Sequence, residues 1–89
     1  MKIQGIEVKI SKDGLDDFET TEAMAVLNDE DATDAERVVA VGKLPRLIFG
    51  SQWTRIKRDL RAANDGKLTN EAVSMFIAEA INAVGALKN

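Results

Sequence analysis

The chain opens with alternating polar and apolar side chains. Ile6, Val8 and Ile10 recur at every second position, which is the period of a β-strand. Gly5 stands just before this run and can adopt the positive φ that a tight turn requires. The pattern therefore predicts a short β-strand or hairpin over residues 1–10.

Residues 15–27 are predicted to form the first helix, although its apolar face is imperfect. Glu22 falls in the middle of that face. The apolar members of the face are Leu15, Phe18, Ala25 and Val26. The acidic sequence NDEDATDAE follows, and we expect it to be a solvated connector that ends at the start of the next helix.

Thr33 and Glu36 have the spacing of a capping box at a helix N-terminus. The apolar sequence RVVAVGKLPRLIFG comes next and is interrupted by Pro45. Because proline has no backbone N–H, it suits the first turn of a helix better than the interior. We therefore predict one helix over residues 34–42 and a short second helix over residues 45–49.

Two amphipathic helices complete the chain, over residues 51–63 and 70–87. The apolar stripe of the first consists of Trp53, Ile56, Leu60 and Ala63. The stripe of the second consists of Val73, Phe76, Ile77, Ala80, Ile81, Val84 and Leu87. The predicted fold is mainly α, a compact bundle of about four helices with a short N-terminal β-strand or hairpin, in one domain over residues 1–89.

Composition narrows the function classes. The chain contains no Cys and no His, which excludes disulfides and thiol nucleophiles and removes the commonest general base and the usual zinc ligand. It has no glycine-rich phosphate loop and no nucleophile elbow. Its 15 Asp and Glu residues fall mostly in connectors and on polar helix faces. We therefore expect no enzyme activity, no cofactor and no catalytic or metal-binding residues.

The location and the partners of the chain are also constrained. No apolar run approaches the roughly 20 residues of a membrane span, and the alternating N-terminus is unlike a signal peptide. The formal net charge of −3 argues against a general nucleic-acid binder. A soluble intracellular protein with no membrane partner is expected.

The sequence AANDGKLTNEAVSMF has a superficial likeness to the calcium loop of an EF-hand. With Gly66 in the sixth position of that loop, Arg61 occupies the first. Ala63 and Ala72 then occupy the third and twelfth positions, where oxygen ligands are required. We therefore interpret Gly66 as the end of one helix and Thr69 as the cap of the next.

Excess apolar surface is the first signal of a binding function. The segment around residues 34–49 carries more apolar side chains than one packed face requires. Leu44, Leu47 and Phe49 are the candidates for a groove or knob that binds a protein partner. Met75, on the polar side of the last helix, is a further candidate because methionine adapts to varied contacts. The alternative is that this segment is buried on two sides and belongs to the core.

A basic helix face is the second signal. Arg55, Lys57, Arg58 and Arg61 lie away from the apolar stripe of residues 51–63, in the outline of a helix-turn-helix recognition helix. The alternative is an ordinary solvated face. The negative net charge favours that alternative, so nucleic acid is not the expected partner.

The order of these parts resembles the small tail assembly chaperones, and related tail-module proteins, of long-tailed (siphovirus-type) bacteriophages of Gram-positive hosts. The likeness is carried by Leu44-Pro45-Arg46-Leu47, Gly50, Trp53, Lys57-Arg58, Leu60-Arg61, Asp65-Gly66 and the stripe from Val73 to Val84. The resemblance implies a mostly helical, non-catalytic protein of the host cytoplasm. Its implied partner is the tape measure protein or a tail tube subunit, whose apolar segments it would keep soluble until the tube polymerises.

Three function classes therefore remain open. The first is an assembly chaperone that binds apolar helices of a tail protein. The second is a small helix-turn-helix-like DNA-binding regulator, and the third is a structural subunit that forms a homo-oligomer.

Overall fold

The computed structural model of the chain describes residues 1–10 and 12–88, with side chains for residues 1–10 and 13–84. The elements, in chain order, are β1 (Lys2–Ile3), β2 (Ile6–Glu7), α1 (Lys12–Leu15), α2 (Phe18–Asn28), α3 (Asp34–Phe49), the 3-10 helix η1 (Gly50–Gln52), α4 (Trp53–Ala63) and α5 (Asn70–Lys88). The predicted mainly helical fold with a short N-terminal hairpin is confirmed. Its radius of gyration, 12.7 Å, is close to the value of about 12 Å for a compact chain of this length.

The N-terminal hairpin consists of two short antiparallel strands joined by a two-residue turn. Ile3 pairs with Ile6, and the turn residues Gln4 and Gly5 have φ values of 52° and 80°. Two consecutive positive φ values give a turn whose twist matches that of the strands. Ile3, Ile6 and Val8 are buried, so the hairpin contributes its apolar face to the core.

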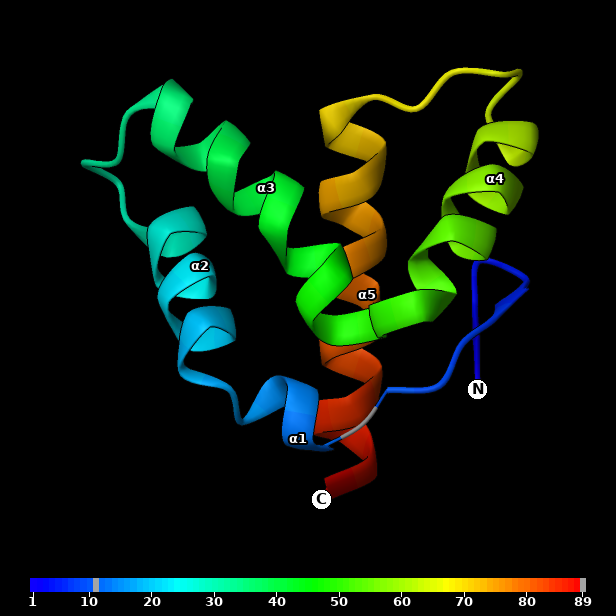
Figure 1. The fold of residues 1–89 in the computed structure, drawn as a ribbon, viewed down its shortest axis with the longest axis horizontal. Helices are drawn as coiled ribbons and strands as arrows, with labels where there is room; N and C mark the ends of the chain where they lie inside the picture. The colour runs from blue at the N-terminus through cyan, green and yellow to red at the C-terminus, as the bar shows by residue number, and fades with distance from the viewer. Residues whose placement is uncertain (11, 89) are drawn as a thin grey trace.

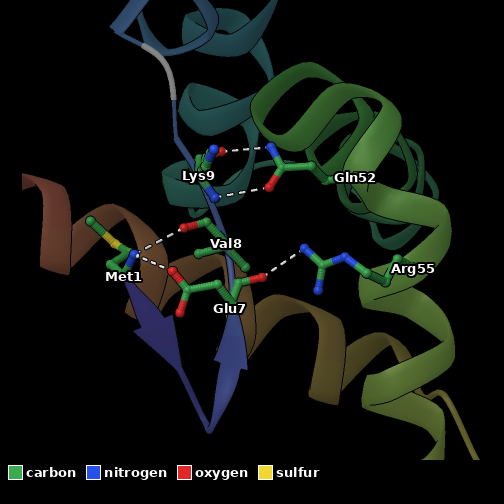
Figure 2. A network of polar contacts seen from close by, with 6 residues as sticks. All are labelled: Met1, Glu7, Val8, Lys9, Gln52 and Arg55. Carbon is green, nitrogen blue, oxygen red and sulfur yellow. Dashed lines mark hydrogen bonds and ion pairs between the residues drawn. The ribbon is translucent and has the colours of Figure 1, made fainter.

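Polar contacts fasten this hairpin to the helical part (Figure 2). The Arg55 guanidinium donates a hydrogen bond of 2.7 Å to the backbone carbonyl of Glu7. The Gln52 side chain accepts from the Lys9 backbone N–H at 2.9 Å and donates to its carbonyl at 2.8 Å. Within the hairpin region itself, the Met1 ammonium donates to a Glu7 carboxylate oxygen at 3.1 Å and lowers the pKa of Glu7.

The helix predicted over residues 15–27 is present from Phe18 as α2, but its predicted start is wrong, because α1 ends at Leu15 and a new helix begins at Phe18. The Asp17 carboxylate accepts the Glu19 backbone N–H at 2.8 Å and caps a new helix there. Thr20 is fully buried, and its hydroxyl donates to the Gly14 carbonyl at 2.7 Å. This hydrogen bond joins α1 to the first turn of α2.

The apolar face predicted for this region is wrong at Phe18 and Ala25, which are exposed. Leu15 and Val26, by contrast, are partly buried against the core. The buried residues of α2 are Thr20 and Ala23, whereas Phe18 is 74% exposed. The prediction failed because the apolar side chains of α2 are spread over more than one face, and only a narrow stripe packs directly on α3. A single-face interpretation cannot represent such a helix.

α3 begins as predicted and ends differently. The Thr33 hydroxyl accepts the Glu36 N–H at 3.1 Å, and the Glu36 carboxylate accepts the Thr33 N–H at 3.0 Å, which completes the capping box. The predicted break between residues 42 and 45 is wrong, because α3 runs unbroken with Pro45 inside it. Pro45 donates no hydrogen bond to the preceding turn. Its ring is fully buried, and this apolar burial offsets the missing bond.

The core is built from buried side chains of the hairpin, α2, α3, α4 and α5, with α3 and β1 packing on α5 (Figure 1). α5 buries Val73, Phe76, Ile77 and Ala80. The Phe49 ring stacks on Trp53 with centroids 6.2 Å apart and lies 5.6 Å from Phe76 at a tilt of 54°. Of the stripe predicted over residues 70–87, Leu87 lies beyond the described side chains. α4 follows η1, so the helix predicted from residue 51 starts as a 3-10 turn.

The connection between α4 and α5 is a helix stop followed by a helix cap. Asp65 and Gly66 have φ values of 55° and 82°, and the Gly66 N–H donates to the Arg61 carbonyl at 2.8 Å. The Thr69 hydroxyl accepts the Ala72 N–H at 3.0 Å. Within the residues that the structure describes, no group of three or more His, Cys, Asp or Glu residues could hold a metal ion. None of the described helices is long and apolar enough to cross a membrane.

Candidate functional site

The structure separates the four residues predicted to bind a partner. Leu44 is fully buried and Phe49 is 2% exposed, so the prediction that they form an exposed surface is wrong. α5 packs on this part of α3, and both side chains belong to the core cluster. Leu47 is half-buried, and Met75 is 54% exposed beside a hollow of about 300 Å³.

The exposed apolar side chains of α3 lie nearer its N-terminus. Val38 and Val39 are 53% and 56% exposed. The buried side chains of α3 begin only at Ala40. The apolar surplus noted in the sequence is therefore real, but its exposed part lies about two turns earlier than predicted.

A first groove, the α2–α5 groove, lies where these two helices diverge. Both pack against α3, and their backbones make no contact with each other within the described part of the chain (Figure 1). The groove measures about 450 Å³. It is lined by Met24, Leu27, Asn28, Leu44, Ser74, Ile77, Ala78, Ile81 and Asn82.

The α2–α5 groove is mainly apolar and has no charged side chain in its lining, although Asn28, Ser74 and Asn82 contribute polar groups. Leu44 forms its floor, Met24 and Leu27 form one wall, and Ile77 and Ile81 form the other. Met24, Leu27 and Ile81 are only partly buried, so apolar surface is available to an occupant. Methionine is flexible and polarisable, which lets this wall adapt to varied contacts.

A second groove, the α2–α3 groove, lies on the other side of α2 and measures about 320 Å³. It is lined by Glu19, Glu22, Ala23, Val26, Ala35, Glu36, Val39, Ala40 and Lys43. These residues recur three or four positions apart on each helix, so each helix contributes one stripe. Small and β-branched side chains form the floor, and ionisable side chains form the rim.

The Glu36 carboxylate of this rim is fixed by its capping contacts. Hydrogen bonds from the Thr33 backbone N–H and the Thr33 hydroxyl lower the pKa of Glu36. Because the pKa is lowered by folding, the stabilising contribution is present above the ordinary Glu value and is lost as the pH falls through the lowered value. Glu36 is therefore an ionised member of the rim at neutral pH.

Replacing Thr33 with alanine is expected to raise the pKa of Glu36 towards its ordinary value, because the hydroxyl contact disappears. An NMR titration of the side-chain carboxyl carbons measures this directly. Thr69→Ala removes a helix cap of the same type that has no glutamate partner, and it should leave the Glu36 titration unchanged. An unshifted Glu36 in the Thr33→Ala protein would contradict the role assigned to the capping box.

The basic residues of α4 are partly engaged within the fold. Arg55 contacts Asp59 at 3.7 Å in addition to its hydrogen bond with the hairpin. Arg58 contacts the same carboxylate at 3.5 Å and is 76% exposed. Lys57 is half-buried and Arg61 is exposed. The position of Asp59 between two arginines favours the interpretation of this face as a solvated one.

No protein-family model, curated protein or solved structure matches this chain. The geometry of the two grooves is therefore the main basis for a function. Sequence reasoning had not singled out Met24 or Leu27, which form one wall of the α2–α5 groove. One signal pointed to them: α2 carries apolar residues on more sides than one packed face requires.

Proposed function

We propose that the protein is a non-enzymatic binding module that holds an apolar helical segment of another protein in the α2–α5 groove. The observation that supports this is the divergence of α2 and α5 over Leu44, which leaves a groove of about 450 Å³ with apolar walls. Such a groove exceeds the lower size limit of about 300 Å³ for ligand pockets in proteins.

The shape and the chemistry of the groove favour a helical occupant. Its lining on α5 extends from Ser74 to Asn82, which is about two helical turns. A helix laid in a groove of this length contributes anchors at positions i, i+3 or i+4, and i+7. None of its lining side chains is charged, so the anchors that fit are apolar.

The proposal agrees with the resemblance to phage tail assembly chaperones. In that setting the occupant is an apolar helix of the tape measure protein or of a tail tube subunit, kept soluble until assembly. A sequence without His and Cys also supports a binding role over catalysis.

Replacing Ala78 with arginine is expected to block the groove, because this exposed residue lies on its wall. The probe is a synthetic helical peptide of about 18 residues, with Leu and Ile on one face and uncharged Gln and Ser on the other. Its affinity should fall about ten-fold or more, measured by fluorescence anisotropy. Ala62→Arg is the matched control, since Ala62 is an exposed alanine on α4 outside the described grooves.

Equal peptide binding by the wild-type protein and the Ala78→Arg variant would overturn the proposal. Sedimentation velocity at several concentrations tests the alternative occupant. A dimer that Ala78→Arg dissociates and Ala62→Arg preserves would identify a second copy in the groove, which is the structural-subunit alternative.

A further inference from the structure

The α2–α3 groove differs from the α2–α5 groove in its charge. Its floor is apolar, with Ala23 and Ala40 at the bottom and Val26 and Val39 on the walls. Val39 is 56% exposed, although it is an aliphatic side chain in the middle of a helix. Apolar surface of this kind, flanked by charged groups on both helices, is the arrangement of a docking site for an amphipathic helix.

The rim of this groove has an excess of negative charge. Glu19 and Glu22 come from α2, and Glu36 comes from α3. Lys43 is the one cation in the lining. Among the described residues, no ion pair engages Glu19, Glu22 or Lys43, so these charges are available to a partner.

The capping box holds Glu36 at the end of the groove nearest the connector. Its carboxylate is anchored by Thr33, so the negative charge there has a fixed position. Lys43 lies two turns further along α3, at the other end. Because α2 and α3 run in opposite directions from the connector (Figure 1), Glu19 in the first turn of α2 lies at the same end as Lys43. The rim therefore has carboxylates at both ends and one cation at the end away from the connector.

We propose that the α2–α3 groove docks a basic amphipathic helix of a partner protein. The apolar stripe of that helix packs on Val26 and Val39, and its Lys or Arg residues meet the carboxylates of the rim. The choice of occupant rests on charge complementarity, which steers association and sets specificity. A symmetric dimer through this groove is disfavoured, because it would bring the same carboxylates face to face.

This inference is independent of the proposed function, because the two grooves lie on different sides of α2. Of the lining residues, the α2–α3 groove uses Glu19, Glu22 and Val26, whereas the α2–α5 groove uses Met24 and Leu27. One protein can therefore hold an apolar helix and a basic helix at the same time.

The test uses two synthetic helical peptides of about 18 residues with the same Leu and Ala stripe. One has Lys on its polar face and the other has Glu. We expect the Lys peptide to bind at least ten-fold more tightly at low salt and to weaken as salt is added. Glu19→Gln combined with Glu22→Gln should weaken the Lys peptide about five-fold, from two exposed ion pairs.

The matched control is Glu71→Gln combined with Glu79→Gln. Glu71 lies in the first turn of α5, as Glu19 lies in that of α2, and Glu79 is exposed in the helix interior. The control changes the net charge equally and should leave the affinity unchanged. Equal weakening by both pairs would mean non-specific attraction and would overturn the proposal.

A second pair of variants tests the apolar wall of the groove. Val39→Gln should weaken the Lys peptide about three-fold or more, whereas Val38→Gln should not, since both valines are similarly exposed but only Val39 lines the groove. Equal effects of the two would overturn the proposal. The Lys peptide should also bind the Ala78→Arg variant normally, so failure of this inference and failure of the proposed function give different results.

Discussion

Replacing Phe49 with alanine is expected to lower the free energy of unfolding by about 3–5 kcal/mol, the usual range for a large buried aromatic side chain. Phe49 is 2% exposed, and its ring contacts those of Trp53 and Phe76. A domain of this size has a total stability near the lower end of about 5–15 kcal/mol. The variant should therefore be unfolded or barely folded at room temperature. Urea denaturation followed by the fluorescence of Trp53, the single tryptophan, measures the change.

The matched control is the same substitution at Phe18, which is 74% exposed. A surface change of this kind is expected to alter the free energy of unfolding by no more than about 0.5 kcal/mol. A Phe49→Ala protein with wild-type stability and impaired peptide binding would contradict the structure. It would restore the sequence-based interpretation of Phe49 as a contact for a partner.

The error at Leu44 and Phe49 shows what periodicity leaves out. The pattern of apolar positions shows how much apolar surface a helix carries, and α3 does carry more than its packed face requires. It does not say which part another helix will cover. α5 begins more than twenty positions further along the chain, and its packing on α3 helps to bury Leu44 and Phe49, whereas Val38 and Val39 remain exposed. That outcome depends on a long-range contact, which a local pattern does not contain.

Features with a complete local signature were predictable. The capping box of Thr33 and Glu36 and the helix stop at Gly66 each depend on residues a few positions apart. Pro45 is the instructive exception. The local rule that proline starts a helix failed because burial of its ring in the core outweighs one lost hydrogen bond.

The grooves beside α2 could not be predicted for a related reason. Their walls come from three helices, and only the packing of α2 and α5 on α3 brings those walls together. One feature of the sequence does reflect this packing. The apolar face assigned to residues 15–27 was interrupted by Glu22, which the structure places on the rim of the α2–α3 groove.

A substitution at the turn between α3 and α4 is expected to have the second large effect on stability. Gly50 caps α3 with φ 58° and ψ −133°, a backbone conformation that residues other than glycine rarely adopt. Replacing it with alanine is expected to lower the free energy of unfolding by about 1–3 kcal/mol. A Cβ placed there meets no atom within 4 Å, so the loss comes from the backbone conformation and not from a clash.

Gly42 is the matched control, because the same substitution there should have the opposite sign. It lies inside α3, and a Cβ at this position also meets no atom within 4 Å. Gly42→Ala should raise the free energy of unfolding by about 0.5–1 kcal/mol, since alanine restricts the unfolded chain and favours the helix. Thermal denaturation separates the two, because 1 kcal/mol shifts the melting temperature of a domain this small by about 4–8 °C. Stabilisation by both substitutions would mean that the chain does not turn at Gly50 in this way. The stacking of Trp53 on Phe49 depends on the same turn, because η1 begins at Gly50 and leads directly into α4, whose first residue is Trp53.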